Sequence, residues 1–535
     1  MRSFLFVIIL LTVINSPSRS QEFVTAKRQN LTFHDENISL RGVSFGNQVW
    51  SDVEIPEHHD QVDFLRVKKM GMNCIRFYLN YKTLEDDAAP YKYKESGWKW
   101  IDKNIEWAKK HNIFLILNIH VPQGGFQSNG KGTALWTDQT NQSRLIKLWG
   151  AIAKRYSKEP IVAGYDLLNE PITTQSKIQW EYLAKAITKE IRVNDPNHLI
   201  IVERLNAIGK SWNNDASMNF IKLDDPNVCY EFHFYSPFQY THQNTPWTGL
   251  GNGGRYPDHE KIVFPNDLKW HTSTFDNPKI LTGNQDWTFY EGKKYRLIDS
   301  NVISAKPALE ASKIGLQGAV MFGQFSIQEF DSSMKFVREI LVQDAGRSSG
   351  WEIWSKNGEG SFKQIDNFSA NNKSALRISE TSDYANVYNN SMRFIPKLGY
   401  YYSISGWAKP EMVSWNAHSL FRIDFEVSPS RSTPVTTDKT FLKKEIEKYE
   451  QWGTENNVPI FLGEFGVYKD CFKKKKGGLD WVSDILDICM NKDIHFTYHA
   501  YNEDAFGIYD GSGPQATLSE PNKELIDLFK SKLLP

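Results

Sequence analysis

The sequence predicts an α/β protein: a (β/α)8 barrel of the TIM type that carries an inserted all-β, jelly-roll-like sandwich. Short apolar strands alternate with amphipathic helices and begin about 30 to 50 residues apart, which is typical of a parallel sheet. This rhythm then stops for about 230 residues, where apolar and polar residues alternate instead. A barrel takes about 250 residues, so the 535-residue chain has room for a second domain.

The first six barrel strands are expected before this break. One of them, residues 113–120, is continuously apolar, which indicates burial on both faces. The helix at 143–156 places Leu145, Leu148 and Ile152 on one stripe. The strands are expected at 39–45, 72–77, 113–120, 164–170, 198–203 and 228–233, and the helices between them at 57–70, 98–111, 143–156 and 177–192.

The segment after the sixth strand has a period of two. Phe421, Ile423 and Phe425 alternate with charged residues, and similar short runs are separated by Asn, Gly, Ser and Pro. Such patterns indicate an antiparallel sandwich. We therefore expect an inserted β-sandwich at 285–432, preceded by a long polar loop at 249–287.

The barrel pattern resumes after the insert. Helices are expected at 440–452, 479–490 and 523–533, and the seventh and eighth strands at 458–466 and 494–500. The barrel is therefore expected in two parts, residues 21–284 and 433–535.

Composition and the N-terminus indicate the compartment. The 63 basic and 63 acidic residues cancel, so neither nucleic acid nor an anionic membrane is implied as a partner. Arg2, an apolar run at 4–14 and a small polar stretch make residues 1–20 typical of a secretory signal peptide. The apolar run is too short to span a membrane. A secreted, extracellular protein without membrane association after cleavage is expected.

The four cysteines do not indicate a metal site. Cys74 and Cys229 fall inside predicted barrel strands and are expected as buried thiols, whereas Cys471 and Cys489 could pair across a loop and a helix. No Cys/His spacing is typical of zinc.

Two glutamates end predicted strands of the buried type. The apolar run at 164–168 stops at Asn169-Glu170-Pro171, because proline cannot continue a ladder. The run at 458–466 carries Glu464 in the same way. Two carboxylates at the ends of buried parallel strands would supply the proton donor and the nucleophile or base of a glycoside hydrolase. The alternative is two unrelated strand-end glutamates.

These motifs resemble a known family. Leu168-Asn169-Glu170-Pro171 and Gly463-Glu464-Phe465-Gly466 resemble the acid/base and nucleophile motifs of glycoside hydrolase family 5. The resemblance implies a (β/α)8 barrel and retaining hydrolysis of β-linked glycans without metal or organic cofactor. The insert resembles carbohydrate-binding modules of families 4 and 9 in the segments 350–354 and 399–408.

The resemblance also implies a substrate-binding set around the two glutamates. An arginine would keep the nucleophile ionised and oriented, and a tyrosine hydroxyl would contact it. At strand eight the family usually offers a tryptophan, where this sequence has a histidine. The set is Arg76, His120, Asn169, His233, Tyr235 and His499.

Exposed aromatics could extend a sugar-binding surface. Trp50, Trp136 and Trp247 lie in expected top-face loops, and Trp407 and Trp415 lie in the insert. For each of them, packing is an equally reasonable role.

The resulting hypothesis is a secreted, monomeric, retaining endo-β-1,4-glucanase that acts on a polysaccharide or oligosaccharide. A β-mannanase or another family 5 β-glycosidase is the alternative within the class. A non-catalytic glycan-binding protein and a transglycosylase are alternatives of other kinds. Retaining chemistry predicts carboxyl groups of Glu170 and Glu464 about 5 Å apart.

Overall fold

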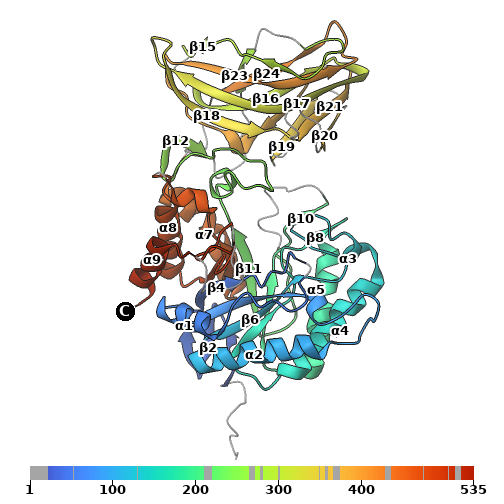
Figure 1. Ribbon diagram of the computed structural model, residues 1–535, viewed down its shortest axis with the longest axis vertical. Helices are drawn as coiled ribbons and strands as arrows, with labels where there is room; N and C mark the ends of the chain where they lie inside the picture. The colour runs from blue at the N-terminus through green and yellow to red at the C-terminus, as the bar shows by residue number, and fades with distance from the viewer. Residues whose placement is uncertain are drawn as a thin grey trace, which may run out of the picture.

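The computed structural model describes residues 22–51, 53–128, 130–209, 220–263, 271–276, 281–298, 302–346, 348, 350–355, 360–365, 374–427, 435–473, 475–503, 505–511 and 520–534. The expected signal peptide lies outside these residues. In Figure 1 a barrel with surrounding helices lies below an all-β domain, drawn mainly in yellow and orange. The blue-to-green first part and the red last part of the chain complete the same barrel.

Eight parallel strands close the barrel, as predicted. Each expected strand is present, because apolar runs buried on both faces suit a parallel sheet that is covered by helices. In order around the barrel they are β4 (Arg41–Phe45), β5 (Cys74–Asn80), β6 (Phe114–Val121), β7 (Val162–Asp166), β9 (Leu199–Glu203), β11 (Val228–Phe234), β26 (Ile460–Phe465) and β27 (His495–Tyr498).

The strand of the first glutamate ends earlier than predicted. β7 stops at Asp166, and Glu170 lies in the segment that follows, so the expected strand at 164–170 was too long. Asn169 still donates its backbone N–H to Ile119 O on β6 at 3.0 Å. The segment therefore continues along the rim of the barrel without belonging to the ladder.

Helices cover the barrel with their apolar stripes. Leu145, Leu148 and Ile152 are buried as predicted and belong to the core between helices and strands. The described residues between β9 and β11 form no helix. The covering helices are α1 (Gln61–Lys69), α2 (Glu95–His111), α4 (Gln139–Tyr156), α5 (Lys177–Asn194), α7 (Lys439–Asn456), α8 (Gly478–Asn491) and α9 (Lys523–Leu533).

A small antiparallel sheet that the sequence analysis did not predict packs against the barrel. Its strands are β1 (Thr25–Lys27), β2 (Asn30–Phe33) and β3 (Glu36–Ile38). Leu31 from this sheet shares an apolar cluster with Cys74, Ala163 and Leu199 from the first halves of barrel strands. The small sheet thus covers the N-terminal ends of the barrel strands, where the interior is apolar. The charged residues of the interior lie nearer the C-terminal ends of the strands.

The inserted domain is an antiparallel sandwich with its own core. Phe421, Ile423 and Phe425 are buried in that core, as their alternation predicted. One sheet has the order β13-β24-β16-β22-β19; the other has the order β14-β23-β17-β21-β20, with β15 on β23 and β18 on β17. The strands are β13 (His271–Asp276), β14 (Thr288–Tyr290), β15 (Tyr295–Arg296), β16 (Val302–Ser312), β17 (Gly315–Phe330), β18 (Phe336–Asp344), β19 (Trp351–Ser355), β20 (Ser361–Ile365), β21 (Ala375–Thr381), β22 (Ala385–Asn389), β23 (Tyr401–Glu411) and β24 (His418–Val427).

A two-stranded stem joins the domains. β12 (Asp258–Val263) pairs antiparallel with β25 (Val435–Thr437), and Val263 lies opposite Val435. The expected loop at 249–287 was therefore wrong in part, because it contains β12 and the sandwich strand β13. Both strands are polar and short, so they carry no apolar pattern.

The cysteines are thiols throughout. All four are buried and free, so Cys471 and Cys489 do not form the disulfide considered above. Cys471 Sγ instead donates to Tyr240 O at 3.2 Å and accepts from Gln243 Nε2 at 3.2 Å. Among the described helices, none combines the length and apolar character needed to cross a membrane.

Candidate active site

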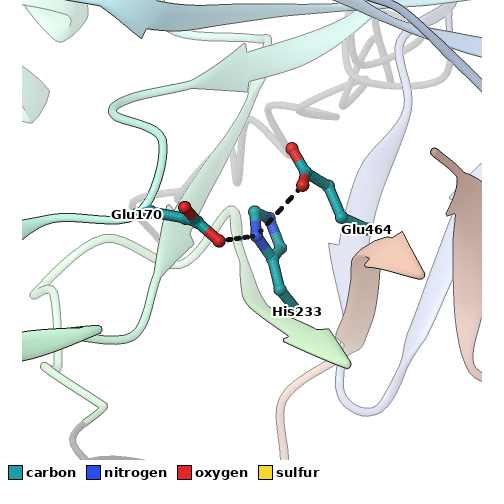
Figure 2. Close-up of side chains that lie close together, drawn as sticks. All are labelled: Glu170, His233 and Glu464. Carbon is teal, nitrogen blue, oxygen red and sulfur yellow. Dashed lines mark hydrogen bonds and ion pairs between the residues drawn. The ribbon is translucent and has the colours of Figure 1, made fainter. Parts of the chain in front are cut away.

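The two glutamates lie on either side of one histidine, as Figure 2 shows. His233 Nδ1 is 3.1 Å from Glu170 Oε1 and 3.6 Å from Glu464 Oε2. One oxygen of each carboxylate and one ring nitrogen of His233 all lie within 4.8 Å of one another. This separation agrees with the predicted value of about 5 Å and is shorter than the roughly 6.5–9.5 Å of inverting enzymes.

Three donors hold the Glu464 carboxylate. Arg76 Nη1 donates to Oε1 at 2.7 Å, the Tyr78 hydroxyl donates to Oε1 at 2.6 Å, and the Tyr235 hydroxyl donates to Oε2 at 2.9 Å. Burial raises the pKa of both tyrosines, so both keep the proton that they donate. Burial would also raise the pKa of Glu464, but the positive charges of His233 and Arg76 outweigh it and hold that pKa well below its ordinary value.

Buried carboxylates in turn hold Arg76. Its Nε lies 2.7 Å from Asp166 Oδ2 and 3.1 Å from Glu231 Oε1, and its Nη2 donates to Asn169 Oδ1 at 3.0 Å. Burial would lower the pKa of Arg76, but Asp166 and Glu231 raise it well above the ordinary value. The guanidinium thus stays charged inside the barrel and orients Glu464 from a fixed position.

Removing the charge of Arg76 should change the acid limb of the pH profile. In Arg76→Gln, Glu464 loses a buried positive neighbour, so its pKa should rise by about 1 to 3 units. Because the nucleophile must be ionised, the acid limb of kcat/KM should move to higher pH by that amount. The profile should be measured beside thermal unfolding, because a broken buried ion pair typically costs about 3–5 kcal/mol of stability.

Arg76→Lys is the matched control, because it keeps the charge and loses the fork of donors. Its acid limb should stay near that of the wild type even if its rate falls. An unchanged limb in Arg76→Gln would show that Arg76 does not set the ionisation of Glu464.

His233 is cationic in this setting. Burial would lower its pKa, but Glu203 and Glu464 raise it well above the ordinary value. Its Nε2 lies 3.3 Å from Glu231 Oε1, so the ring faces carboxylates on both edges. Among the described residues, Glu170, His233 and Glu464 are the one group spaced to hold a metal ion. Because a protonated ring nitrogen cannot bind a metal ion, the proton on His233 disfavours metal binding at this group.

The other expected substrate ligands lie around Arg76 and Tyr78, the two residues that hold Glu464. His120 stacks on Tyr78 with ring centroids 4.0 Å apart, and burial lowers its pKa well below the ordinary value, so it is neutral. His499 Nδ1 lies 3.1 Å from the Tyr78 hydroxyl, and burial lowers its pKa too. Asn169 Nδ2 donates to Ser128 Oγ at 3.2 Å. Fixed, uncharged polar groups of this kind suit hydroxyl recognition.

The tryptophans separate into two kinds. Trp50 is 46% exposed, and its ring centroid lies 5.5 Å from that of His120 and 6.2 Å from that of His499. Trp247 is 56% exposed and lies 6.2 Å from Phe506, which contacts His499. Both rings are partly open to solvent, and Trp50 contacts two of the histidines around Tyr78.

Trp136 is a correction to the expected set of platforms. It is 5% exposed in α3 (Ala134–Thr137), and its Nε1 donates to Gln127 Oε1 at 2.8 Å. Its ring packs edge-on against Trp180 in the helical layer. It therefore stabilises a loop and offers no open face.

The insert tryptophans lie on the sandwich. Trp415 is 90% exposed, and Trp407 on β23 lies beside Phe289 with centroids 5.6 Å apart.

Sequence reasoning missed four members of this site: Tyr78, Asp166, Glu203 and Glu231. Tyr78 is two residues from Arg76 on β5, so strand alternation places both side chains on one face. Asp166 and Glu203 are the last residues of β7 and β9, and Glu231 is two residues before His233 on β11. For Tyr78 and Glu231, the alternation of side chains along a strand was the signal that the sequence offered.

A family model matches the first part of the barrel. Residues 31–288 match the model for Cellulase (glycosyl hydrolase family 5). The match includes Glu170 and ends before Glu464.

Curated relatives carry related names. Endoglucanase C of Acetivibrio thermocellus is 31% identical over 212 residues, which are 39% of this chain and 60% of the relative. Cellodextrinase A of Ruminococcus flavefaciens is 25% identical over 286 residues, which are 51% of this chain and 80% of the relative. The chain thus spans about 60% of the length of the endoglucanase that it matches.

A solved structure also aligns with the chain. Endoglucanase Cel5A from Thermotoga maritima covers 91% of this chain and 96% of its own at a TM-score of 0.49 and 16% identity.

Proposed function

Because the barrel belongs to glycoside hydrolase family 5, we propose that this protein is a retaining glycoside hydrolase that cuts β-1,4-glucan chains internally. The observation that carries the proposal is the pair of carboxylates of Glu170 and Glu464 within 4.8 Å, with His233 between them. The names of the relatives support the choice of glucan. The expected signal peptide supports secretion, and we propose that the enzyme acts as a monomer.

The catalytic sequence has two steps. Glu464, ionised and held by Arg76, Tyr78 and Tyr235, attacks the anomeric carbon while Glu170 protonates the leaving oxygen. A water then cleaves the glycosyl-enzyme, with Glu170 acting as the base. In the first step the positive charge of His233 offsets negative charge on the two carboxyl groups beside it, because His233 keeps its proton in the resting site.

A panel of soluble polysaccharides tests this proposal. We expect the wild type to release reducing ends from carboxymethyl cellulose faster than from mannan or xylan, with viscosity falling early, as internal cleavage requires. Preference for mannan would change the substrate and leave the chemistry intact; His499, in place of the usual tryptophan, makes this comparison necessary. No turnover of any β-glycan would favour a glycan-binding protein. An added acceptor sugar would reveal a transglycosylase.

The sandwich should be separable from the barrel. The two have separate apolar cores, and Val263 already lies opposite Val435 in the stem. Replacing residues 264–434 by Asn-Gly should close a hairpin and leave a folded barrel. We propose that the insert binds long glycans, so the excised protein should keep most activity on soluble oligosaccharides and lose activity on insoluble cellulose.

The measurement is kcat/KM on cellopentaose beside sugar release from insoluble cellulose, with circular dichroism as the check of folding. The double variant Trp407→Ala, Trp415→Ala is the control within the intact chain. If excision prevented folding, or lowered both activities equally, the insert would be a structural part of the enzyme.

A further inference from the structure

The backbone at Glu170 has a conformation that needs support. Its φ is +43°, in the left-handed region that side chains other than glycine rarely adopt. The next residue is Pro171, which further restricts the residue before it. Something in the surrounding structure must therefore hold this peptide in place.

The end of β9 provides this support. The backbone N–H of Glu170 donates to Glu203 Oε2 at 2.5 Å. Just beyond, β8 (Ile172–Thr173) pairs in parallel with β10 (Ala207–Ile208), and Asn206 N–H donates to Pro171 O at 2.9 Å. The segment of the expected acid/base is thus bound along its length to the segment that follows Glu203.

The Glu203 side chain is placed for a specific task. It has no exposed surface, and its backbone carbonyl accepts from Trp180 Nε1 at 2.8 Å. Its second oxygen, Oε1, lies 3.6 Å from His233 Nδ1 and makes no hydrogen bond within the described part of the chain. A carboxylate would be an expensive group to bury with one oxygen unbonded.

Burial opposes the ionisation of Glu203. Burial raises its pKa well above the ordinary value, as does the nearby charge of Glu231, although His233 and Arg76 act in the opposite direction. With or without a proton, the carboxyl keeps an oxygen that accepts from the Glu170 N–H.

We infer that Glu203 is a positioning residue, which holds the backbone of Glu170 so that its carboxyl meets His233 and faces Glu464. The inference rests on the proposed role of Glu170 as acid/base. Glu203 does not touch the reacting atoms; it acts through the peptide of Glu170.

The test compares two substitutions of Glu203. Glu203→Gln keeps an oxygen that can accept from the Glu170 N–H, so kcat/KM on cellopentaose should stay within about threefold of the wild type. Glu203→Ala removes the acceptor, and displacement of the acid/base should lower kcat/KM on the same substrate about 100-fold. With 2,4-dinitrophenyl β-cellobioside, which needs no proton for departure, the first step should fall less than about tenfold. Added azide should then speed turnover of the aryl glycoside by Glu203→Ala but not by the wild type.

Asp195→Ala is the matched structural control. Asp195 is also fully buried, and its Oδ1 accepts from the backbone N–H of Asn197 at 2.9 Å and of His198 at 3.1 Å. It precedes β9 at the opposite end of the barrel from Glu203. It should lower the melting temperature without changing the ratio of the two substrates or producing azide rescue.

Three results would overturn the inference. Glu203→Ala could keep the substrate ratio of the wild type, it could match Asp195→Ala in every readout, or Glu203→Gln could be as damaged as Glu203→Ala. The last result would mean that the charge of Glu203 matters and not its acceptor.

Crystal structures separate this inference from the proposed function. In Glu203→Ala the Glu170 carboxyl should leave hydrogen-bond reach of His233, and in Glu203→Gln it should stay. An inactive wild type would reject the proposed function, whereas an unmoved Glu170 in Glu203→Ala would reject the positioning role.

Discussion

Replacing Glu464 by Gln should abolish turnover of polymer and of activated aryl glycosides alike, by on the order of 10⁵-fold in kcat. The amide cannot attack the anomeric carbon, so no covalent intermediate forms, however good the leaving group. Such a loss corresponds to about 7 kcal/mol of transition-state stabilisation. The loss should be measured with carboxymethyl cellulose and with 2,4-dinitrophenyl β-cellobioside.

Glu426→Gln is the control for this variant. Glu426 is also a fully buried glutamate held by cations, with Arg393 Nε and Lys306 Nζ each at 2.7 Å, but it lies in the sandwich. It should lower stability and retain activity on the aryl glycoside. If Glu464→Gln kept measurable turnover of the aryl glycoside above a trace of wild-type contamination, Glu464 would not be the nucleophile.

Replacing Glu170 by Gln should give a loss that depends on the leaving group. On polymer, where the departing oxygen needs a proton, kcat/KM should fall by about 10³- to 10⁴-fold. On 2,4-dinitrophenyl β-cellobioside the glycosyl-enzyme should still form quickly, and it should accumulate because water is no longer activated.

A burst of dinitrophenol in stopped-flow absorbance would show that accumulation. Azide, which needs no general base, should then restore steady turnover and yield the β-azide. The two variants should differ in their losses on the two substrates and in their response to azide only if the two carboxyls have different roles. Equal losses for both variants on both substrates would contradict the assignment.

The barrel could be predicted because its strands are buried on both faces. Runs such as 113–120 have no polar face, and helices with a single apolar stripe follow them, so the βα rhythm is visible in one sequence. The insert interrupted that rhythm clearly. Its edges were less clear, because β12 and β13 are polar strands held by pairing with β25 and β24, far along the chain.

The centre of the site was predictable where residues end strands in a recognisable motif. Glu170, Glu464, Arg76, His233 and Tyr235 were expected together, and the structure brings them together. Their contacts link distant parts of the sequence: Arg76 and Glu464 are 388 positions apart.

The supporting carboxyls could not be predicted in the same way. Asp166, Glu203 and Glu231 lie in otherwise apolar strands, and a single charged residue there gives no sign of its partners. Their pairing with Arg76 and His233 arises only when the barrel closes. The prediction for Trp136 was wrong, because the sequence of a loop does not show whether a tryptophan ring is exposed or packed under a neighbouring loop.

Trapping the covalent intermediate tests the central claim most directly. A 2-deoxy-2-fluoro cellobioside with an activated leaving group should inactivate the wild type, because the fluorine slows release of the glycosyl-enzyme more than its formation. Mass spectrometry of the digested protein should place one fluorocellobiosyl group on the peptide that contains Glu464, and Glu464→Gln should remain unlabelled. A label on Glu170, or inactivation without any covalent sugar, would contradict a retaining mechanism with Glu464 as its nucleophile.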